Sequence, residues 1–231
     1  MCIIKVIIPA INEEKSIAKV LKEIPEIVSE VILVDNNSSD NTAEIAKQNG
    51  AKVIKELKKG YGYACLKGIN ELINNPPDIL VFLDGDYSDY PNELNDIVKP
   101  IIDNKVDFVI GSRIKKWREK HSMTPQQIFG NWLSCKLMQF LYDSKFTDLG
   151  PFRAIRWNTL MNLNMHDKTY GWTIEMQLKI LKKKLSYTEV PVHYKKRIGV
   201  SKVSGTFKGT IFAGLKIIGW IFKYYFSKKI L

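Results

Sequence analysis

The stretch Ile79-Leu80-Val81-Phe82-Leu83-Asp84-Gly85-Asp86 decides how this sequence folds. Its first five residues are apolar, and such a run bounded by turn residues is typical of a short buried strand. Gly85 allows a tight turn at the end of that strand, and two carboxylates one residue apart face similar directions. Such a pair suits a hard divalent cation that also holds a diphosphate. The alternative is that both aspartates only form a turn or cap a helix.

Short apolar runs on either side of this stretch predict further strands. The predicted strands cover residues 3–9, 31–35, 52–54, 79–84 and 108–111, and helical patterns lie between them at 14–24, 41–49, 61–74 and 91–104. Apolar strands that alternate with helices predict an α/β fold, in which a mostly parallel sheet carries helices on both faces. Ligands of such sheets bind beyond the carboxyl ends of the strands, where the polar motifs of this chain lie.

The second half of the chain is less regular and ends in a long apolar pattern. We expect helices at 125–142 and 172–184, a strand near 185–192, and a helix at 206–226. Lysines recur along one side of the last helix, and its uncharged runs are too short to span a bilayer. Residues 206–231 are therefore predicted to form an amphipathic helix at the membrane interface. The alternative is a helix that packs on the core or in a homo-oligomer.

Length and composition indicate one large globular domain. The chain has 231 residues, of which 45% are hydrophobic and 26% are charged, so wholesale disorder is excluded. The three cysteines are far apart and form no CxxC motif, which argues against a disulfide scaffold and a structural zinc site. The first residues enter an apolar strand without a basic region or a cleavage site. We therefore expect no signal peptide and a reducing, cytoplasmic compartment.

The charge is distributed unevenly along the chain. Residues 1–112 carry 12 Lys/Arg against 18 Asp/Glu, a net of −6, whereas residues 113–231 carry 23 against 6, a net of +17. A basic half suggests a polyanionic partner: nucleic acid, an anionic membrane surface or a phosphorylated substrate. The alternative is a solvated lysine surface. Nucleic acid is disfavoured, because the basic half has no reading motif and its aromatic residues gather in apolar helices.

Two further polar clusters follow predicted strands and, with Asp84-Gly85-Asp86, form an ordered set of motifs. The set comprises Pro-Ala-x-Asn-Glu at residues 9–13, Val-Asp-x-x-Ser-x-Asp-x-Thr at residues 34–42, and Leu-Asp-Gly-Asp at residues 83–86. Their order and spacing resemble glycosyltransferase family 2. Gly111-Ser112-Arg113, the segment Asp-Leu-Gly-Pro-Phe-Arg at 148–153, and Arg197-x-x-Gly-x-Ser-Lys202 are similar to its dolichyl-phosphate mannose/glucose synthase branch.

The resemblance implies a GT-A fold, which is a Rossmann-like α/β domain, and a nucleotide-diphosphate sugar as donor. It implies one domain over 1–205, with a nucleotide-sugar-binding half at 1–113 and an acceptor half at 114–205. Asp84 and Asp86 would hold Mg²⁺ or Mn²⁺ together with the donor diphosphate. The expected catalytic residues are Asp86, Arg113, Glu175, Arg197 and Lys202. The expected substrate-binding residues are Pro9, Asn12, Glu13, Asp35, Asn37, Gly60, Gly62, Asp84, Asp148, Arg153 and Ser201.

The same resemblance assigns a region to each group of residues. Arg113 would contact phosphate near the transferring centre, and Arg197, Ser201 and Lys202 would lie on a mobile loop that closes over the diphosphate. Both Arg and Lys suit phosphate oxygens. The chain departs from the branch where Ser88 and Asp89 replace an amide and where Gln126, Gln127 and Asn131 replace a basic residue. These departures leave the sugar and the acceptor open.

The acceptor decides whether the reaction needs a general base. A hydroxyl must lose its proton, whereas a phosphate oxygen is already anionic at neutral pH. We predict inverting, metal-dependent transfer of a hexose to a polyprenyl phosphate of the dolichyl or undecaprenyl type, at the inner face of a membrane to which the protein binds peripherally. The alternative is transfer to a hydroxyl of a saccharide or glycolipid, with Glu175 or Asp148 as the base.

Overall fold

The computed structural model describes residues 2–199 and 207–227, with the side chains of the last helix described from residue 212. Its centre is a seven-stranded sheet in the order β3-β2-β1-β4-β6-β5-β7. All neighbouring strands are parallel except β6, which is antiparallel to both β4 and β5. The strands are β1 (Ile4–Ala10), β2 (Val28–Asp35), β3 (Lys52–Lys55), β4 (Ile79–Phe82), β5 (Phe108–Ser112), β6 (Arg153–Arg156) and β7 (Tyr187–Pro191). The predicted mostly parallel sheet is therefore confirmed.

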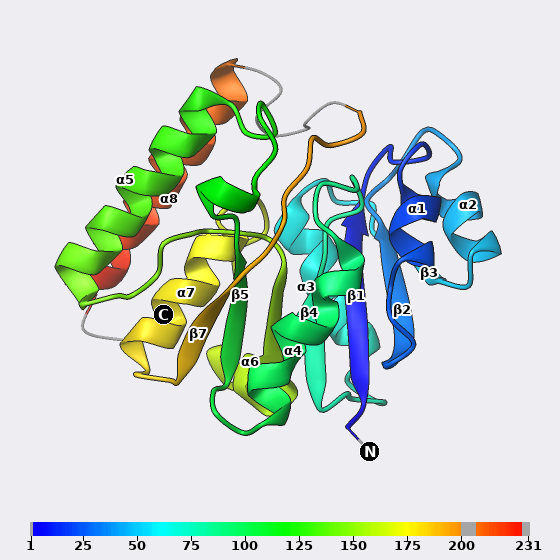
Figure 1. Ribbon diagram of the computed structural model, residues 1–231, viewed down its shortest axis with the longest axis horizontal. Helices are drawn as coiled ribbons and strands as arrows, with labels where there is room; N and C mark the ends of the chain where they lie inside the picture. Colours follow the sequence, from blue (N-terminus) through cyan, green and yellow to red (C-terminus); the bar gives the residue numbers. More distant parts are fainter. Residues whose placement is uncertain (1, 200–206, 228–231) are drawn as a thin grey trace.

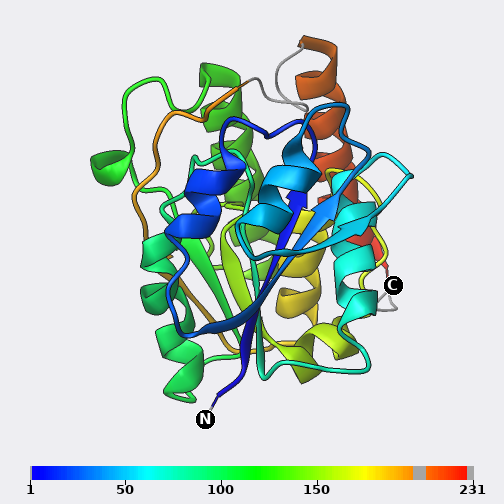
Figure 2. The same cartoon turned by 90° about the vertical axis from the view of Figure 1, so that its right-hand side faces the viewer.

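Helices cover both faces of the sheet and enclose a separate core on each face (Figure 1). Figure 2 shows the sheet between its two layers, with α1 and α4 on one side and α3, α7 and α8 on the other. The first layer comprises α1 (Ile17–Lys22), α2 (Thr42–Gln48) and α4 (Leu94–Ile102). The second comprises α3 (Tyr61–Glu71), α5 (Pro125–Tyr142), α6 (Trp157–Leu163), α7 (Trp172–Lys182) and α8 (Phe207–Phe226).

Local sequence features mark the ends of two helices. Pro91 opens a short 3-10 turn ahead of α4, a position that tolerates its missing N–H. Asn41 is the N-cap residue of α2 and makes no side-chain capping hydrogen bond in the described structure, whereas the carboxylate of Asp40 accepts a hydrogen bond from Thr42 N at 3.0 Å. Gly50 follows α2 with a φ of +85°, a left-handed conformation that glycine adopts without strain.

Strand β6 and helix α6 are absent from the sequence-based prediction. β6 has only four residues and begins and ends with arginine, so it lacks the apolar run that marks the other strands. The guanidinium of Arg153 is nevertheless fully buried, because it donates to the carbonyl oxygens of Gly150 and Thr173 at 3.1 and 3.0 Å. These tertiary hydrogen bonds offset the cost of burying the guanidinium. A sequence pattern contains no information about them, so it could not predict this strand.

Helix α8 lies against α5 and α7 and leaves an apolar face uncovered. Tyr142 at the end of α5 donates to the carbonyl of Ile221 at 2.5 Å, and Lys182 of α7 donates to that of Tyr224 at 2.7 Å. Ile221 and Tyr224 are buried, whereas Phe226 is 75% exposed. Among the described residues, no helix combines the length and the hydropathy needed to cross a bilayer. The division at residue 205 and the membrane role of 206–231 stay predictions.

Candidate active site

The carboxyl ends of β1 and β2 bring the first two polar clusters together. Pro9 lies in β1 beside Val34 of β2, one register position before Asp35. The Asn12 N–H donates to Ser38 Oγ at 3.0 Å, and Asn12 Oδ1 accepts from Ser39 N at 2.8 Å. Three other predicted substrate-binding residues lie in these loops. Glu13 donates from its backbone N–H to Thr42 Oγ1, and Asp35 accepts from Ser38 N. Asn37 is exposed and has a φ of 65°.

Gly60 and Gly62, at the N-terminus of α3, are placed against the backbone of residues 167–169. The Gly62 N–H donates to Thr169 O at 3.2 Å, and a Cβ on Gly62 would lie 2.0 Å from Asp167 O. Only glycine allows this close approach. Asn36, which the sequence-based prediction missed, holds the preceding loop by accepting from Gly60 N at 2.8 Å. The predicted contact of both glycines with the donor stays a prediction.

The two aspartates that follow β4 are held in fixed orientations. Asp84 Oδ1 accepts from the Tyr61 hydroxyl at 3.1 Å. Asp86 Oδ1 accepts from the backbone N–H and the hydroxyl of Ser88, at 2.9 and 2.5 Å. Burial and the nearby negative charge of Asp86 raise the pKa of Asp84 to about 7. Two neighbouring carboxylates repel each other when both are ionised, so a bound cation would stabilise the doubly ionised pair.

Arg197 already supplies positive charge to this site. Its Nη2 lies 2.9 Å from Asp86 Oδ2 and 3.5 Å from Glu13 Oε1, while its buried Nε has no hydrogen-bond partner in the described part of the chain. The segment that carries Arg197 is paired with the turn after β4, because Ile198 N donates to Asp86 O and Lys195 N to Ser88 O. Ser201 and Lys202 lie outside the described residues, so the rest of the predicted lid is not placed.

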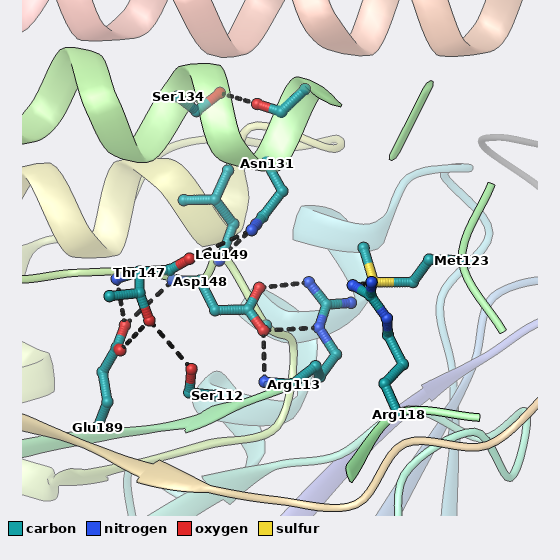
Figure 3. A network of polar contacts seen from close by, with 12 residues as sticks. Ser112, Arg113, Arg118, Met123, Asn131, Ser134, Thr147, Asp148, Leu149 and Glu189 are labelled. Atoms are coloured by element: carbon teal, nitrogen blue, oxygen red, sulfur yellow. Dashed lines mark hydrogen bonds and ion pairs between the residues drawn. The ribbon is translucent and has the colours of Figure 1, made fainter. Parts of the chain in front are cut away.

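Arg113, at the end of β5, forms a fork with Asp148 (Figure 3). Its Nε and Nη2 donate to the two carboxylate oxygens at 2.9 and 2.6 Å, and its backbone N–H donates to Asp148 Oδ2 at 2.7 Å. Burial alone would raise the pKa of Asp148, but this ion pair holds it below its ordinary value. Glu189 of β7 fixes the loop behind the pair by accepting from the N–H groups of Thr147 and Asp148.

Glu175 and Arg153, two predicted site residues, lie in the protein interior. The Glu175 side chain is fully buried, pairs with Lys179 Nζ at 2.9 Å and accepts from the N–H groups of His166 and Asp167. The Arg153 guanidinium is bound to backbone carbonyls, as described above. Each therefore has protein partners that satisfy its charge or hydrogen bonds, and their predicted roles in substrate binding and catalysis stay predictions.

A cavity of about 310 Å³ joins the polar centre to the two outer helices. Its lining includes the side chains of Asp84, Asp86, Arg113, Arg197 and Tyr194. Helices α5 and α8 contribute the apolar side chains of Leu133, Ala213, Ile217 and Ile218 and the polar side chains of Gln126, Gln127, Asn131 and Ser134. Tyr194 was missed by the sequence-based prediction; its ring lies 5.0 Å from the Arg113 guanidinium, and no motif marks it. The cavity therefore combines charged side chains with a wall of apolar and uncharged polar side chains from α5 and α8.

Comparisons with known proteins agree with this arrangement. The glycosyl transferase family 2 model matches residues 5–163. A dolichyl-phosphate hexose transferase of Haloferax volcanii is 32% identical over 218 residues, covering 92% of this chain and 91% of the relative. A UDP-N-acetylglucosamine–dolichyl-phosphate N-acetylglucosaminyltransferase of Methanococcus voltae is 32% identical over 213 residues, covering 82% and 84%.

A solved structure confirms the fold independently of close sequence similarity. Glucosyl-3-phosphoglycerate synthase from Mycobacterium tuberculosis, crystallised with Mn²⁺, UDP-glucose and phosphoglyceric acid, superposes with a TM-score of 0.78 at 18% identity. The match covers 99% of this chain and 81% of that chain. With the motifs at the strand ends and the relatives above, the chain belongs to glycosyl transferase family 2 and is a glycosyltransferase of GT-A fold.

Proposed function

We propose that this glycosyltransferase moves a hexose, with inversion, from a nucleotide-diphosphate sugar to a polyprenyl phosphate at a membrane surface. A phosphate oxygen of the acceptor would attack the anomeric carbon of the sugar from the side opposite the diphosphate. The new carbon–oxygen bond would form as the bond to the diphosphate breaks, and the nucleoside diphosphate would leave with the electron pair. The acceptor oxygen is already anionic, so no proton has to be removed.

The observation that carries this proposal is the shape and chemistry of the cavity. Arg113 and Arg197 line it and suit phosphate groups, and α5 and α8 contribute the apolar side chains of Leu133, Ile217 and Ile218. A lipid phosphate has the same two parts, an anionic head and an apolar chain. The two dolichyl-phosphate sugar transferases among the relatives support the same acceptor class.

The residues after β4 fit a divalent cation that is shared with the donor diphosphate. In the described residues, no three His, Cys, Asp or Glu side chains are placed to hold a metal by themselves. Mg²⁺ and Mn²⁺ sites that bind phosphates often use only one or two carboxylates, and here Asp84 and Asp86 would supply them. When bound, the cation would neutralise charge on the leaving diphosphate. The Mn²⁺ in the superposed synthase supports this assignment.

The surroundings of the candidate bases favour a phosphate acceptor over a hydroxyl. Both oxygens of Asp148 are bound to Arg113, and the carboxylate of Glu175 is buried away from the cavity. Among the described residues that line the cavity, the carboxylates are those of Asp84 and Asp86, the proposed metal ligands. Arg113, oriented by Asp148, would instead position the acceptor phosphate.

The uncovered faces of α5 and α8 support peripheral attachment to an anionic membrane surface. Phe140 of α5 is 87% exposed, and Phe226 of α8 is exposed nearly as much. The net charge of +17 on residues 113–231 would attract this part of the chain to anionic headgroups. Under this proposal residues 1–113 bind the donor, residues 114–205 bind the acceptor head, and the C-terminal helix holds the enzyme at the inner membrane face.

A product assay tests the proposal. Purified protein with Mn²⁺ is incubated with a panel of nucleotide sugars, with and without polyprenyl phosphate, and sugar in an acid-labile lipid phosphodiester is measured. We expect that product with the wild type and with Asp96→Ala, an exposed control, and a loss of at least 100-fold with Asp86→Ala. Transfer only to a saccharide or glycolipid would contradict the proposal and favour the hydroxyl acceptor.

A further inference from the structure

A second cavity, of about 370 Å³, adjoins the first and has no assigned role. The two cavities share a wall made of Arg113, Met123 and Asn131, but Asp84 and Asp86 line only the first. Figure 3 shows part of the second cavity's lining, with Arg113 and Arg118 near Met123. The second cavity lies between the segment after β5, helix α5 and the loop at residues 147–148.

The lining of this cavity carries uncompensated positive charge. Among the residues that the structure describes, four cationic side chains line it, those of Arg113, Lys115, Arg118 and Lys136, against the single carboxylate of Asp148. That carboxylate is already bound through both oxygens to Arg113. In the part of the chain that the structure describes, the other three cations form no ion pair with a carboxylate. A cavity with this charge balance favours an anionic ligand.

Arg118 gives the strongest indication of an anionic ligand. Its Nη1 donates to the thioether sulfur of Met123 at 3.4 Å, and sulfur is a weak acceptor. The residue is partly buried. A guanidinium forms its strongest hydrogen bonds with carboxylate or phosphate oxygens. Within the described ranges, Lys136 Nζ likewise meets only a neutral oxygen, that of Gln139 at 3.1 Å.

The same cavity opens beside exposed apolar side chains of α5. Ile128 and Trp132 both line it and are 40% and 52% exposed. Phe129 lies on the same helix, is also exposed, and its ring is 5.8 Å from that of Trp132. A ligand with an anionic head and an apolar tail could therefore place its head among the cations and its tail along α5.

We propose that this cavity binds the phosphodiester headgroup of an anionic membrane phospholipid, with the acyl chains against Ile128 and Trp132. The site would fasten α5 to the bilayer beside the proposed acceptor cavity. Unlike the first cavity, it contains neither of the proposed metal ligands, and it needs no donor sugar. The inference rests on the proposed attachment to an anionic membrane surface, but it stands or falls separately from the transfer reaction.

The test measures binding of the full chain to vesicles in the absence of donor, metal and polyprenyl phosphate. Vesicles of phosphatidylcholine alone are compared with vesicles that contain about 30% phosphatidylglycerol, at a fixed ionic strength. The variants are Arg118→Gln and Lys136→Gln, with Lys223→Gln as the matched control. Lys223 is exposed on α8 and lies outside the cavity, so it reports general attraction of a lysine to the surface. Thermal melts confirm that each variant folds.

We expect the phosphatidylglycerol vesicles to bind the wild type more tightly than phosphatidylcholine alone. Arg118→Gln and Lys136→Gln should each weaken that binding about tenfold, because each removes a charge-assisted hydrogen bond. Lys223→Gln should weaken it no more than about threefold. Equal losses in all three variants would overturn the proposal in favour of general electrostatic attraction.

A second arm separates a lipid headgroup from a free phosphate. Inorganic phosphate at millimolar concentration is added to the wild type and to Arg118→Gln, and the melting temperatures are compared. A phosphate-dependent rise that only the wild type shows, together with equal vesicle binding by both proteins, would assign the cavity to a soluble phosphate. That result would contradict the lipid assignment.

Discussion

The guanidinium of Arg197 forms an ion pair with Asp86, one of the two proposed metal ligands, with Nη2 2.9 Å from Asp86 Oδ2. The same nitrogen lies 3.5 Å from Glu13 Oε1, so the arginine bridges the first and third polar clusters. A metal ion that binds Asp86 would compete with this contact. Arg197 could then turn its guanidinium, including the Nε that has no hydrogen-bond partner among the described residues, toward the donor diphosphate.

Removing the arginine should therefore separate metal binding from transfer. Arg197→Gln is expected to increase Mn²⁺ affinity about fivefold without donor, because a partly exposed ion pair of about 1 kcal/mol no longer competes. Transfer should fall at least tenfold, since a contact to the diphosphate is lost. Titration followed by the Mn²⁺ electron paramagnetic resonance signal measures the first effect. Weaker metal binding by the variant would contradict the competition.

Metal affinity should depend on pH through Asp84. Burial and Asp86 raise its pKa to about 7, well above the ordinary 3.8, and only the ionised carboxylate binds a cation. Mn²⁺ affinity should rise about tenfold per pH unit up to about pH 7 and then level off. Calorimetric titrations between about pH 5.5 and 8 measure this slope. Asp84→Asn is the control and should bind weakly with little pH dependence; an unchanged slope in that variant would exclude Asp84 as the titrating group.

The raised pKa of Asp84 also predicts how the unfolding free energy of the metal-free protein depends on pH. Because the folded-state pKa of Asp84 lies above its unfolded value, the unfolded chain loses this proton first. The contribution of Asp84 to stability should therefore be greatest below about pH 4 and decline as the pH rises through about 7. The difference in unfolding free energy between wild type and Asp84→Asn, measured at several pH values, checks the sign. A difference that moves in the opposite direction would contradict it.

Glu175 should matter more for folding than for chemistry. Its carboxylate and Lys179 are both fully buried, and Glu175→Gln would leave the lysine without its ion-pair partner. We expect a loss of about 3 kcal/mol in unfolding free energy, measured by urea denaturation. Lys179→Met in the same background should recover part of the loss, because the unpaired charge is gone. A stable Glu175→Gln protein with no transfer activity would instead support a general base.

We expect an alanine at Gly62 to destabilise the protein and an alanine at Gly219 of α8 to be tolerated. A Cβ at Gly62 would overlap the backbone oxygen of Asp167, so Gly62→Ala should destabilise the protein by at least about 2 kcal/mol. A Cβ at Gly219 would meet no heavy atom of the described residues within 4 Å, and Gly219→Ala should stabilise α8 by about 0.5 to 1 kcal/mol. Thermal melts compare the two. Equal melting temperatures would show that residues 167–169 can move away from α3.

The sequence by itself determined the sheet and the edge at which the site lies. Apolar runs such as 79–84 are buried wherever they fold, and parallel strands must end at a common edge. The position of Asp84 and Asp86 after one of these runs therefore followed from pattern alone. Helix α5 was predicted over its full length, because Pro125 and the apolar spacing mark it locally.

Only the tertiary structure decided which charges meet. Arg113 pairs with Asp148, which lies 35 residues further along the chain. Glu13 contacts Arg197, from which it is separated by 184 residues. The burial of Glu175 with Lys179 and the acceptance of Arg153 inside the sheet depend on hydrogen-bond partners from other elements. The periodicity of apolar residues in the sequence indicates which side chains are buried. A buried charge, in contrast, is stable only where the folded chain supplies its partner.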